Sequence, residues 1–279
     1  MLTDKPWRLD ALVQLGLALF ISMSVGMLVA GLWASRDEGS FAVLVIGAVS
    51  FHGVALPCVG WFLWVHRLSW SEAFGFHTPG SGRAVLLAVG ATVLALPFAW
   101  MLGWCSGELM KLVHFTPVPQ KAVTLVQQTV AVGPQVFIAG VAVVVAPLAE
   151  ELLFRGVLYP ALRAQQVLRW NRLLSPSEGG PTQTCLSVWR RGLRHLAAGL
   201  PPGWSAWLGT PRPWAAAVLT SVLFGSIHLN VMTFLPLSFF GLVLIWLYEK
   251  TGNLLAPILS HSLFNLANFF FLVWGRSTP

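Results

Sequence analysis

Long apolar runs recur along this chain, separated by short polar stretches. A helix needs about 20 residues to cross a hydrocarbon core of ~30 Å, and the runs predict seven spans of that kind. They are 11–33, 41–66, 84–105, 133–160, 214–230, 232–249 and 253–275. The runs are continuous and do not alternate in polarity, which favours helices over a closed barrel. The predicted fold class is all-α: a polytopic transmembrane helical bundle of about seven spans plus short interfacial helices.

Composition supports this interpretation. Hydrophobic residues make up 56% of the 279 residues and charged residues only 10%, with a mean hydropathy of +0.72. These values exclude an ordinary soluble globular domain. The first span follows Lys5 and Arg8 as a secretory signal would, but no small-residue cleavage site follows it, so we expect a retained helix. The three cysteines have unrelated spacings and predict neither a disulfide framework nor a cysteine metal site.

The distribution of basic residues predicts an orientation. With the N-terminus in the cytoplasm, thirteen of the seventeen Lys and Arg residues fall in cytoplasmic segments. The net charge of +7 then reflects orientation and contact with anionic lipid at the cytoplasmic face, and no nucleic-acid partner is expected. The chain length and the excess of Arg over Lys favour a bacterial inner (plasma) membrane. The expected protein is therefore multi-pass, with its N-terminus in the cytoplasm.

Two adjacent carboxylates, Glu150 and Glu151, interrupt the fourth apolar run. Ionisable groups at membrane depth cost several kcal/mol each and by default mark a functional site. Arg155 follows Glu151 by four residues, so the two pair on one helix face, whereas Glu150 is rotated by about 100° and need not share that partner. One carboxylate is thus neutralised, and the other is available for chemistry.

Two further polar pairs lie in the later spans. Phe224 and His228 are four residues apart, and so are His261 and Asn265, so each pair shares a helix face. A carboxylate in a low-dielectric pocket can take a proton from water and later return it, which suits Glu150. Imidazoles can orient that water, and an amide with an imidazole can donate hydrogen bonds to an oxyanion. These groups predict a hydrolase that cleaves peptide bonds within or beside the membrane.

Three stretches of the sequence resemble the signature motifs of a known family. They are Glu-Glu-x-x-Phe-Arg at 150–155, Phe-x-x-x-His at 224–228 and the Thr-Gly-Asn run that continues to Asn265 at 251–265. In this order and on membrane helices, they resemble the CAAX-protease and bacteriocin-processing (CPBP, or ABI) family of intramembrane glutamic endopeptidases. The resemblance covers roughly residues 133–275. The long stretch between the first two motifs departs from the family pattern.

The resemblance implies a role for each candidate residue. Glu150 would be the base that activates water, and His228 the second group that positions it. His261 and Asn265 would donate to the oxyanion. Glu151 would be the structural and electrostatic neighbour of the base, with Arg155 and Phe224 as supporting residues. No cofactor is implied, and the substrate would be a membrane-anchored or lipidated protein or peptide cut near its anchor or C-terminus.

The resemblance also divides the chain. Residues 1–132 form an N-terminal transmembrane scaffold of three spans and an interfacial helix, the latter within 106–132. Residues 133–279 form the catalytic transmembrane core, which carries a long cytoplasmic insertion at 161–213. Within that insertion, leucines recur between arginines over 186–200, a pattern of either a cationic amphipathic helix on the lipid surface or a solvated connector.

Other interpretations of these residues remain open. The glutamates and histidines are possible zinc ligands, although no His-Glu-x-x-His motif occurs in the sequence. A proton or solute carrier uses buried carboxylates and histidines, and an immunity or scaffold protein would keep the fold without catalysis. Each pair taken alone is also compatible with packing between helices. The remaining histidines have no partner pattern and are interpreted as surface or packing residues: His52, His66, His77, His114 and His195.

The depth of the site poses one difficulty. If the fifth apolar run crossed the membrane completely from Trp214, His228 would lie nearer the opposite face than the glutamates. We expect Glu150, His228 and His261 to converge in one cavity. The fifth helix must therefore be tilted, displaced or reshaped near Pro213 and Pro236.

Overall fold

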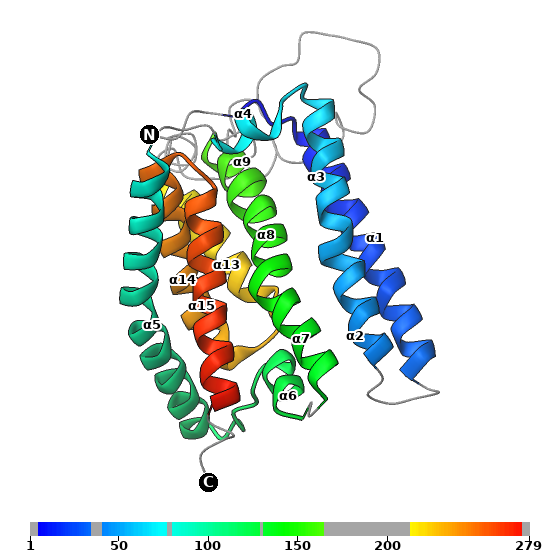
Figure 1. Cartoon of the computed structure of the whole chain (residues 1–279), viewed down its shortest axis with the longest axis vertical. Coiled ribbons are helices and arrows are strands. Elements are labelled where there is room, and N and C mark those ends of the chain that lie inside the picture. Colours follow the sequence, from blue (N-terminus) through cyan, green and yellow to red (C-terminus); the bar gives the residue numbers. More distant parts are fainter. Residues whose placement is uncertain (1–4, 35–40, 77–79, 129–130, 165–212, 275–279) are drawn as a thin grey trace, which may run out of the picture.

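The computed structural model describes residues 5–34, 41–76, 80–128, 131–164 and 213–274. Within these ranges the chain is helical and contains no strand. Figure 1 shows the helices packed side by side, with most of their long axes roughly aligned. This arrangement confirms the predicted all-α helical bundle. The amphipathic helix expected over 186–200 lies outside the described residues.

Helices η1, η2 and η3 are π-helical segments that continue the α-helices on either side of them. The elements are α1 (Leu9–Ala34), α2 (Phe41–Ala48), η1 (Val49–Gly53), α3 (Val54–Val65), α4 (Trp70–Phe74), α5 (Ser81–Leu112), α6 (Lys121–Gln128), α7 (Val132–Gly140), η2 (Val141–Val145), α8 (Ala146–Glu151), η3 (Leu152–Leu158), α9 (Tyr159–Arg163), α13 (Pro213–Ser226), α14 (Val231–Thr251) and α15 (Leu255–Trp274). Helix α6 is a short helix in the stretch where an interfacial helix was predicted.

Six helices of the described part are long and apolar enough to cross a membrane. They are Asp10–Trp33, Phe41–Val65, Gly82–Leu112, Val132–Arg163, Val231–Thr251 and Leu255–Val273. The prediction of seven full spans was wrong at the fifth run, where α13 has 14 residues. At 1.5 Å per residue, such a helix extends only about 21 Å, less than the ~30 Å of hydrocarbon. The predicted helix over 214–230 instead ends at Ser226, before a turn that leads into α14.

The first two spans form a hairpin that Figure 1 shows to the side of the other helices. Trp7 anchors its beginning: the side chain is fully buried, and its ring lies 5.0 Å from that of Phe62 in an edge-to-face contact. Gly26 allows α1 to approach η1 closely, because a side chain at this position would collide with Ser50. Much of the apolar surface of α1 is exposed, including Phe20 and Met27, as expected for contact with lipid.

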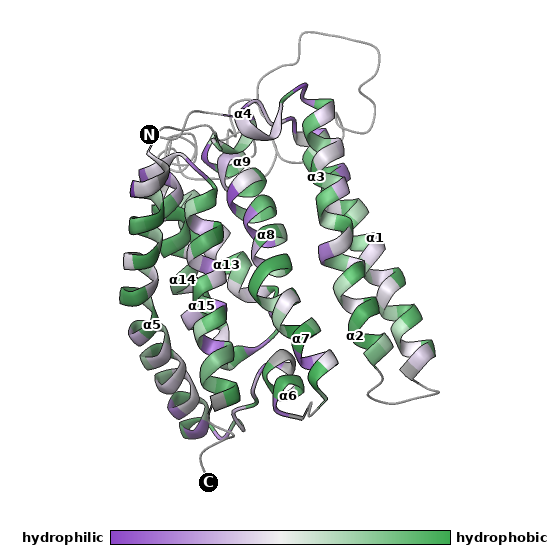
Figure 2. Ribbon diagram, viewed as in Figure 1, coloured by the Kyte–Doolittle hydropathy of each residue, from purple (hydrophilic) through white to green (hydrophobic). Residues whose placement is uncertain are grey.

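The fourth span lies between this hairpin and the remaining helices (Figure 1). Its α8 and η3 segments are almost entirely buried, and its interruptions at η2 and η3 flank the two glutamates on both sides. Figure 2 shows apolar residues over most of the helical surface and hydrophilic positions within α8. Polar groups inside a buried helix need partners, which the neighbouring helices provide.

Helices α13 and α14 form a tight hairpin. Gly241 of α14 lies against Ser221 of α13, where an added Cβ would be 3.0 Å from the serine Cβ. Gly225 of α13 lies against α14, where an added Cβ would be 2.8 Å from the carbonyl oxygen of Phe234. Small residues let membrane helices approach closely. The hairpin therefore holds Phe224 and the start of the following turn at a fixed position in the bundle.

Candidate active site

The two adjacent glutamates end α8, and both are buried. Glu151 forms the salt bridge that its spacing predicted: Nη1 of Arg155 lies 2.9 Å from Oε1 of Glu151, and both side chains are fully buried. Nη2 of Arg155 donates to the carbonyl oxygen of Gly241 in α14 at 3.2 Å. The Glu151–Arg155 pair is therefore locked both along its own span and to the α13–α14 hairpin.

Phe224 supports this ion pair from α13. Its fully buried ring lies under the Arg155 guanidinium, 4.3 Å from Cζ to the ring centroid. A cation above an aromatic face is stabilised by the ring quadrupole, more so when both are shielded from water. The sequence spacing predicted a contact of Phe224 with His228 only. Its contact with Arg155 was not predicted.

His261 of α15 contacts both glutamates. Its Nδ1 lies 2.8 Å from Oε1 of Glu151, and its Nε2 lies 4.0 Å from Oε2 of Glu150. The ring is held edge-to-face between Phe224 and Phe240, with centroid distances of 5.7 and 5.8 Å. Because an ionised carboxylate only accepts hydrogen bonds, Nδ1 of His261 is the donor. Its Nε2 is therefore directed at the carboxylate of Glu150.

His228 follows the end of α13 and is partly buried. Its Nδ1 lies 2.8 Å from the carbonyl oxygen of Phe224. A carbonyl oxygen only accepts, so Nδ1 carries a proton and the neutral ring has its lone pair on Nε2. The two rings are also in edge-to-face contact at 5.1 Å. Because α13 ends early, His228 reaches the cavity wall that includes Glu150, which resolves the difficulty of depth.

Asn265 follows His261 by one helical turn, and its Nδ2 donates to the carbonyl oxygen of Ala142 in η2 at 2.8 Å. It is not among the residues that line the cavity with Glu150. In this structure Asn265 connects α15 to the fourth span. Polar side chains commonly form such hydrogen bonds between membrane helices without any catalytic role. The amide carries a second N–H, so its role as an oxyanion donor stays a prediction.

A cavity of about 410 Å³ opens beside Glu150. We call it the active-site chamber. Its polar side chains are those of Glu150, His228 and His52, and apolar side chains form the rest of its wall. The apolar wall consists of Leu12, Leu15, Leu19 and Met23 from α1, Phe51 from η1, Leu153, Phe154, Val157 and Leu158 from η3, and Ile227, with Gly16 between them. Such a site, mostly apolar with a few convergent polar groups, is typical of ligand pockets.

His52 is the site residue that sequence reasoning missed. It was interpreted as a surface or packing residue, yet its Nε2 lies 3.7 Å from Oε1 of Glu150. It belongs to the second span, far from the three motifs, and no spacing rule links it to them. The available signal was weaker: a histidine inside an apolar span is itself a candidate for function.

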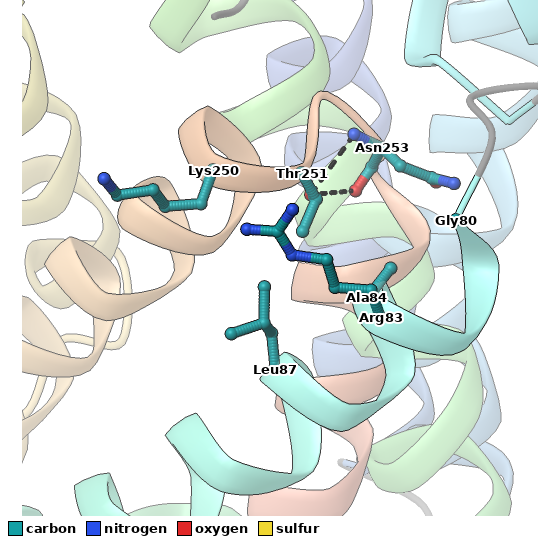
Figure 3. A pocket seen from close by; sticks show the side chains of 7 residues that line it. All are labelled: Gly80, Arg83, Ala84, Leu87, Lys250, Thr251 and Asn253. Carbon is teal, nitrogen blue, oxygen red and sulfur yellow. Dashed lines mark hydrogen bonds between the residues drawn. The ribbon is translucent and has the colours of Figure 1, made fainter.

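A second hollow, of about 80 Å³, lies where α5 begins and α14 ends (Figure 3). Arg83 and Lys250 lie at its rim, and Thr251 accepts a hydrogen bond from the backbone N–H of Asn253 within it. It contains no carboxylate and no imidazole, so it is not the candidate active site. Two cations at one end of the bundle fit the predicted contact with anionic lipid, which stays a prediction.

A metal site was an alternative for the same residues. Among the side chains that the structure describes, no three His, Cys, Asp or Glu residues are grouped so that they could hold a metal ion. Glu151 is already paired with Arg155 and His261. The candidate residues therefore do not fit the three protein ligands that a catalytic zinc needs. Independence from cofactors stays a prediction.

Comparison with known proteins identifies the region that carries this geometry. Residues 132–267 match the model of a family described as type II CAAX prenyl endopeptidase Rce1-like. We call this stretch, which is similar to that family, the Rce1-like region. The match agrees with the resemblance drawn from the three motifs. No curated protein and no solved structure matches the sequence.

The Rce1-like region contains the five residues predicted to be catalytic and both supporting residues. Of the polar residues that line the chamber, it contains Glu150 and His228 but not His52. Both α1 and η1 also precede the match, although both contribute to the chamber wall. The family thus accounts for one side of the chamber, and the N-terminal hairpin completes the other.

Proposed function

We propose that this multi-pass membrane protein, a CAAX-type protease by family, is an intramembrane glutamic endopeptidase. It hydrolyses a peptide bond near the membrane anchor or the C-terminus of a membrane-attached protein or peptide. The observation that carries the proposal is the position of Glu150: its carboxylate lies at the wall of a largely apolar chamber, beside two imidazoles and next to an ion pair that neutralises its neighbour.

Charge balance supports Glu150 as the base. Glu150, Glu151 and Arg155 together carry one negative charge when ionised, and Arg155 is held by Glu151. The unbalanced carboxylate is therefore Glu150, whose Oε2 has no hydrogen-bond partner in the described part of the chain. A buried carboxylate without a donor gains by accepting a proton, and water bound in the chamber would be its source.

In the proposed reaction, Glu150 takes one proton from water and later returns it to the leaving group. One water proton passes to the Glu150 carboxylate while the water oxygen attacks the scissile carbonyl carbon, and Nε2 of His228 accepts a hydrogen bond from the same water. The resulting oxyanion receives hydrogen bonds from Asn265 and, with both ring nitrogens protonated, from Nε2–H of His261. The C–N bond then breaks as Glu150 returns its proton to the leaving nitrogen. The products are a carboxylic acid and an amine, with one water consumed.

The apolar wall of the chamber supports a membrane-attached substrate. Leu12, Leu15, Leu19 and Met23 line it from one face of α1 and would contact the anchor of the substrate while the peptide bond reaches Glu150. The family description names CAAX prenyl endopeptidases, so a prenylated C-terminal peptide is the first substrate class to test. A bacterial inner-membrane location and a cytoplasmic N-terminus complete the proposal, on the positive-inside distribution of the basic residues.

The central experiment replaces Glu150 by Gln. The purified full-length protein in phospholipid vesicles is given a fluorescence-quenched peptide that ends in a farnesylated CAAX sequence. Because Gln cannot take the water proton, we expect the E150Q variant to cleave at least ~10²-fold more slowly than the wild type. Glu108→Gln is the matched control, since the Glu108 side chain is 44% exposed and pairs with Lys111 three residues away.

The same assay distinguishes the alternatives. Equal cleavage by the wild type and the E150Q variant would overturn the proposal. Loss of wild-type cleavage on addition of a chelator, with recovery on addition of zinc, would favour a zinc-dependent protease. A transport or immunity phenotype that survives Glu150→Gln would favour a carrier or a scaffold. Peptides that accumulate uncut in cells with the E150Q form would identify the natural substrate.

A further inference from the structure

His52 faces the proposed base from a part of the chain that carries no motif. It lies in η1, and its side chain is 18% exposed, with Nε2 3.7 Å from Oε1 of Glu150. Its other ring nitrogen, Nδ1, is buried and has no hydrogen-bond partner among the described residues. The ring is in edge-to-face contact with Phe51 at 5.0 Å. Glu150 is therefore the polar side chain toward which His52 is directed.

The carboxylate of Glu150 lies between two imidazoles that approach different oxygens. His52 is nearest Oε1, and His261 is nearest Oε2. Both distances are longer than a direct hydrogen bond, whose usual upper limit is ~3.2 Å between heavy atoms. Catalytic hydrogen bonds are often long in the absence of substrate and shorten when it binds. A donor at Oε1, together with the His261 ring packed beside Oε2, would fix both the plane of the carboxylate and its rotation.

The local backbone explains why this histidine faces the chamber. A π-helical segment adds a residue to a helical turn and so changes the direction of the side chains that follow it, and such segments are frequent at functional sites. Segment η1 continues α2 and α3 without a break, and Gly53 ends it. His52 and Phe51 both line the active-site chamber, so η1 contributes a polar and an apolar side chain to the same wall.

We propose that His52 is a positioning residue for Glu150. Its Nε2–H donates to Oε1 and holds the carboxylate in the orientation in which it takes the proton of the attacking water. His52 keeps its own proton throughout, so the balance of the reaction does not change. The inference rests on the proposed function. Its consequence is that the Rce1-like region is incomplete without the N-terminal hairpin, which supplies one of the groups around the base.

The test compares two kinds of replacement in the full-length protein. His52→Phe removes the donor and keeps the ring volume, His52→Leu removes it with a smaller side chain, and His52→Gln keeps an N–H near the position of Nε2. With the farnesylated quenched peptide in vesicles, we expect His52→Phe and His52→Leu to lower kcat by ~10 to 100-fold at unchanged KM, because a misplacement of about 1 Å in a catalytic site can cost ~10²-fold. His52→Gln should recover most of kcat.

The control and the fold are measured alongside. His114→Asn replaces an exposed histidine outside the chamber and should leave kcat unchanged. Thermal unfolding in detergent identifies the variants that keep the fold, and kcat is compared among those. A gross loss of stability in His52→Gln as well as in both apolar variants would show a purely structural role and overturn the inference.

Three kinetic outcomes also overturn it. They are an unchanged kcat in both apolar variants, a rise in KM alone, and a His52→Gln variant as slow as His52→Phe. The Glu150→Gln variant in the same assay separates the two proposals. If Glu150→Gln is inactive while His52→Phe is fully active, only the role of His52 fails. If Glu150→Gln is active, the proposed function itself fails.

Discussion

Glu150 and Glu151 are neighbours in the sequence, yet their carboxylates have different partners. Oε1 of Glu151 is shared between Arg155 and His261 at 2.9 and 2.8 Å, in full burial. Glu150 has only imidazoles at 3.7 and 4.0 Å and lies at the chamber wall. One residue of helix rotation, about 100°, is enough to place one carboxylate in a buried ion pair and the other at the chamber wall.

The buried ion pair leads to a prediction of stability. Arg155→Met leaves the Glu151 carboxylate buried without its cation, which costs ~3 to 5 kcal/mol when one partner of a buried pair is removed. Lys111→Met breaks the exposed pair with Glu108 and should cost at most about 1 kcal/mol. The free energy of unfolding in detergent, from denaturant titration, measures both. Equal losses in the two variants would show that the Glu151–Arg155 pair does not stabilise the fold.

At the scale of the element, α13 and α14 depend on close contact between their backbones. Gly225 and Gly241 lie where the other helix leaves no space for a side chain. The hairpin in turn holds Phe224 under Arg155 and places His228 at the chamber. Packing of the hairpin therefore determines the geometry of the site.

Gly225→Ala tests this dependence. The added methyl group would meet the carbonyl oxygen of Phe234 at 2.8 Å, and we expect this overpacking to lower the free energy of unfolding by ~1 to 3 kcal/mol. Gly90→Ala in α5 is the control, because nothing lies within 4 Å of its added Cβ. Since Ala favours helix by up to ~1 kcal/mol, the control should be neutral or stabilised. A Gly225→Ala variant that is as stable as the control would contradict the close packing.

The sequence predicted those features that depend on contacts between residues close together in the chain. Spacing within one helix predicted the Glu151–Arg155 pair and the proximity of Phe224 to His228, because helix geometry alone sets both. The early end of α13 depends on the turn that follows: Leu229 has a left-handed backbone conformation, and Asn230 caps α14 by accepting from the N–H of Thr233. The Asn before an apolar run was a readable cap signal. His52 had no such local signal.

At the scale of the whole molecule, two groups of helices enclose the chamber. The N-terminal hairpin provides α1 and η1, and the Rce1-like region provides α8, η3 and the turn after α13. Of the three residues predicted to converge on one cavity, Glu150 and His228 line the chamber, whereas His261 does not and lies 4.0 Å from Glu150. The predicted division at residue 132 stays a prediction.

The path of the chain leads to a prediction of topology. Helix α1 begins at the end of the bundle near α4 and α9, whereas α15 ends at the opposite end (Figure 1). With the N-terminus in the cytoplasm, a reporter fused after residue 279 should face the other side of the membrane. Fusions of alkaline phosphatase and of a fluorescent protein to the C-terminus measure this. Cytoplasmic fluorescence without phosphatase activity would contradict the arrangement.

The contact between Glu151 and His261 has a consequence for biosynthesis. Arg155 follows Glu151 at a spacing of four residues, but His261 belongs to α15 and is translated more than a hundred residues later. In a nascent or truncated chain that lacks α15, Glu151 can therefore pair with Arg155 but not with the imidazole of His261. If Glu150 acts as proposed, partial chains that end before α15 remain inert in the membrane, because they lack His261.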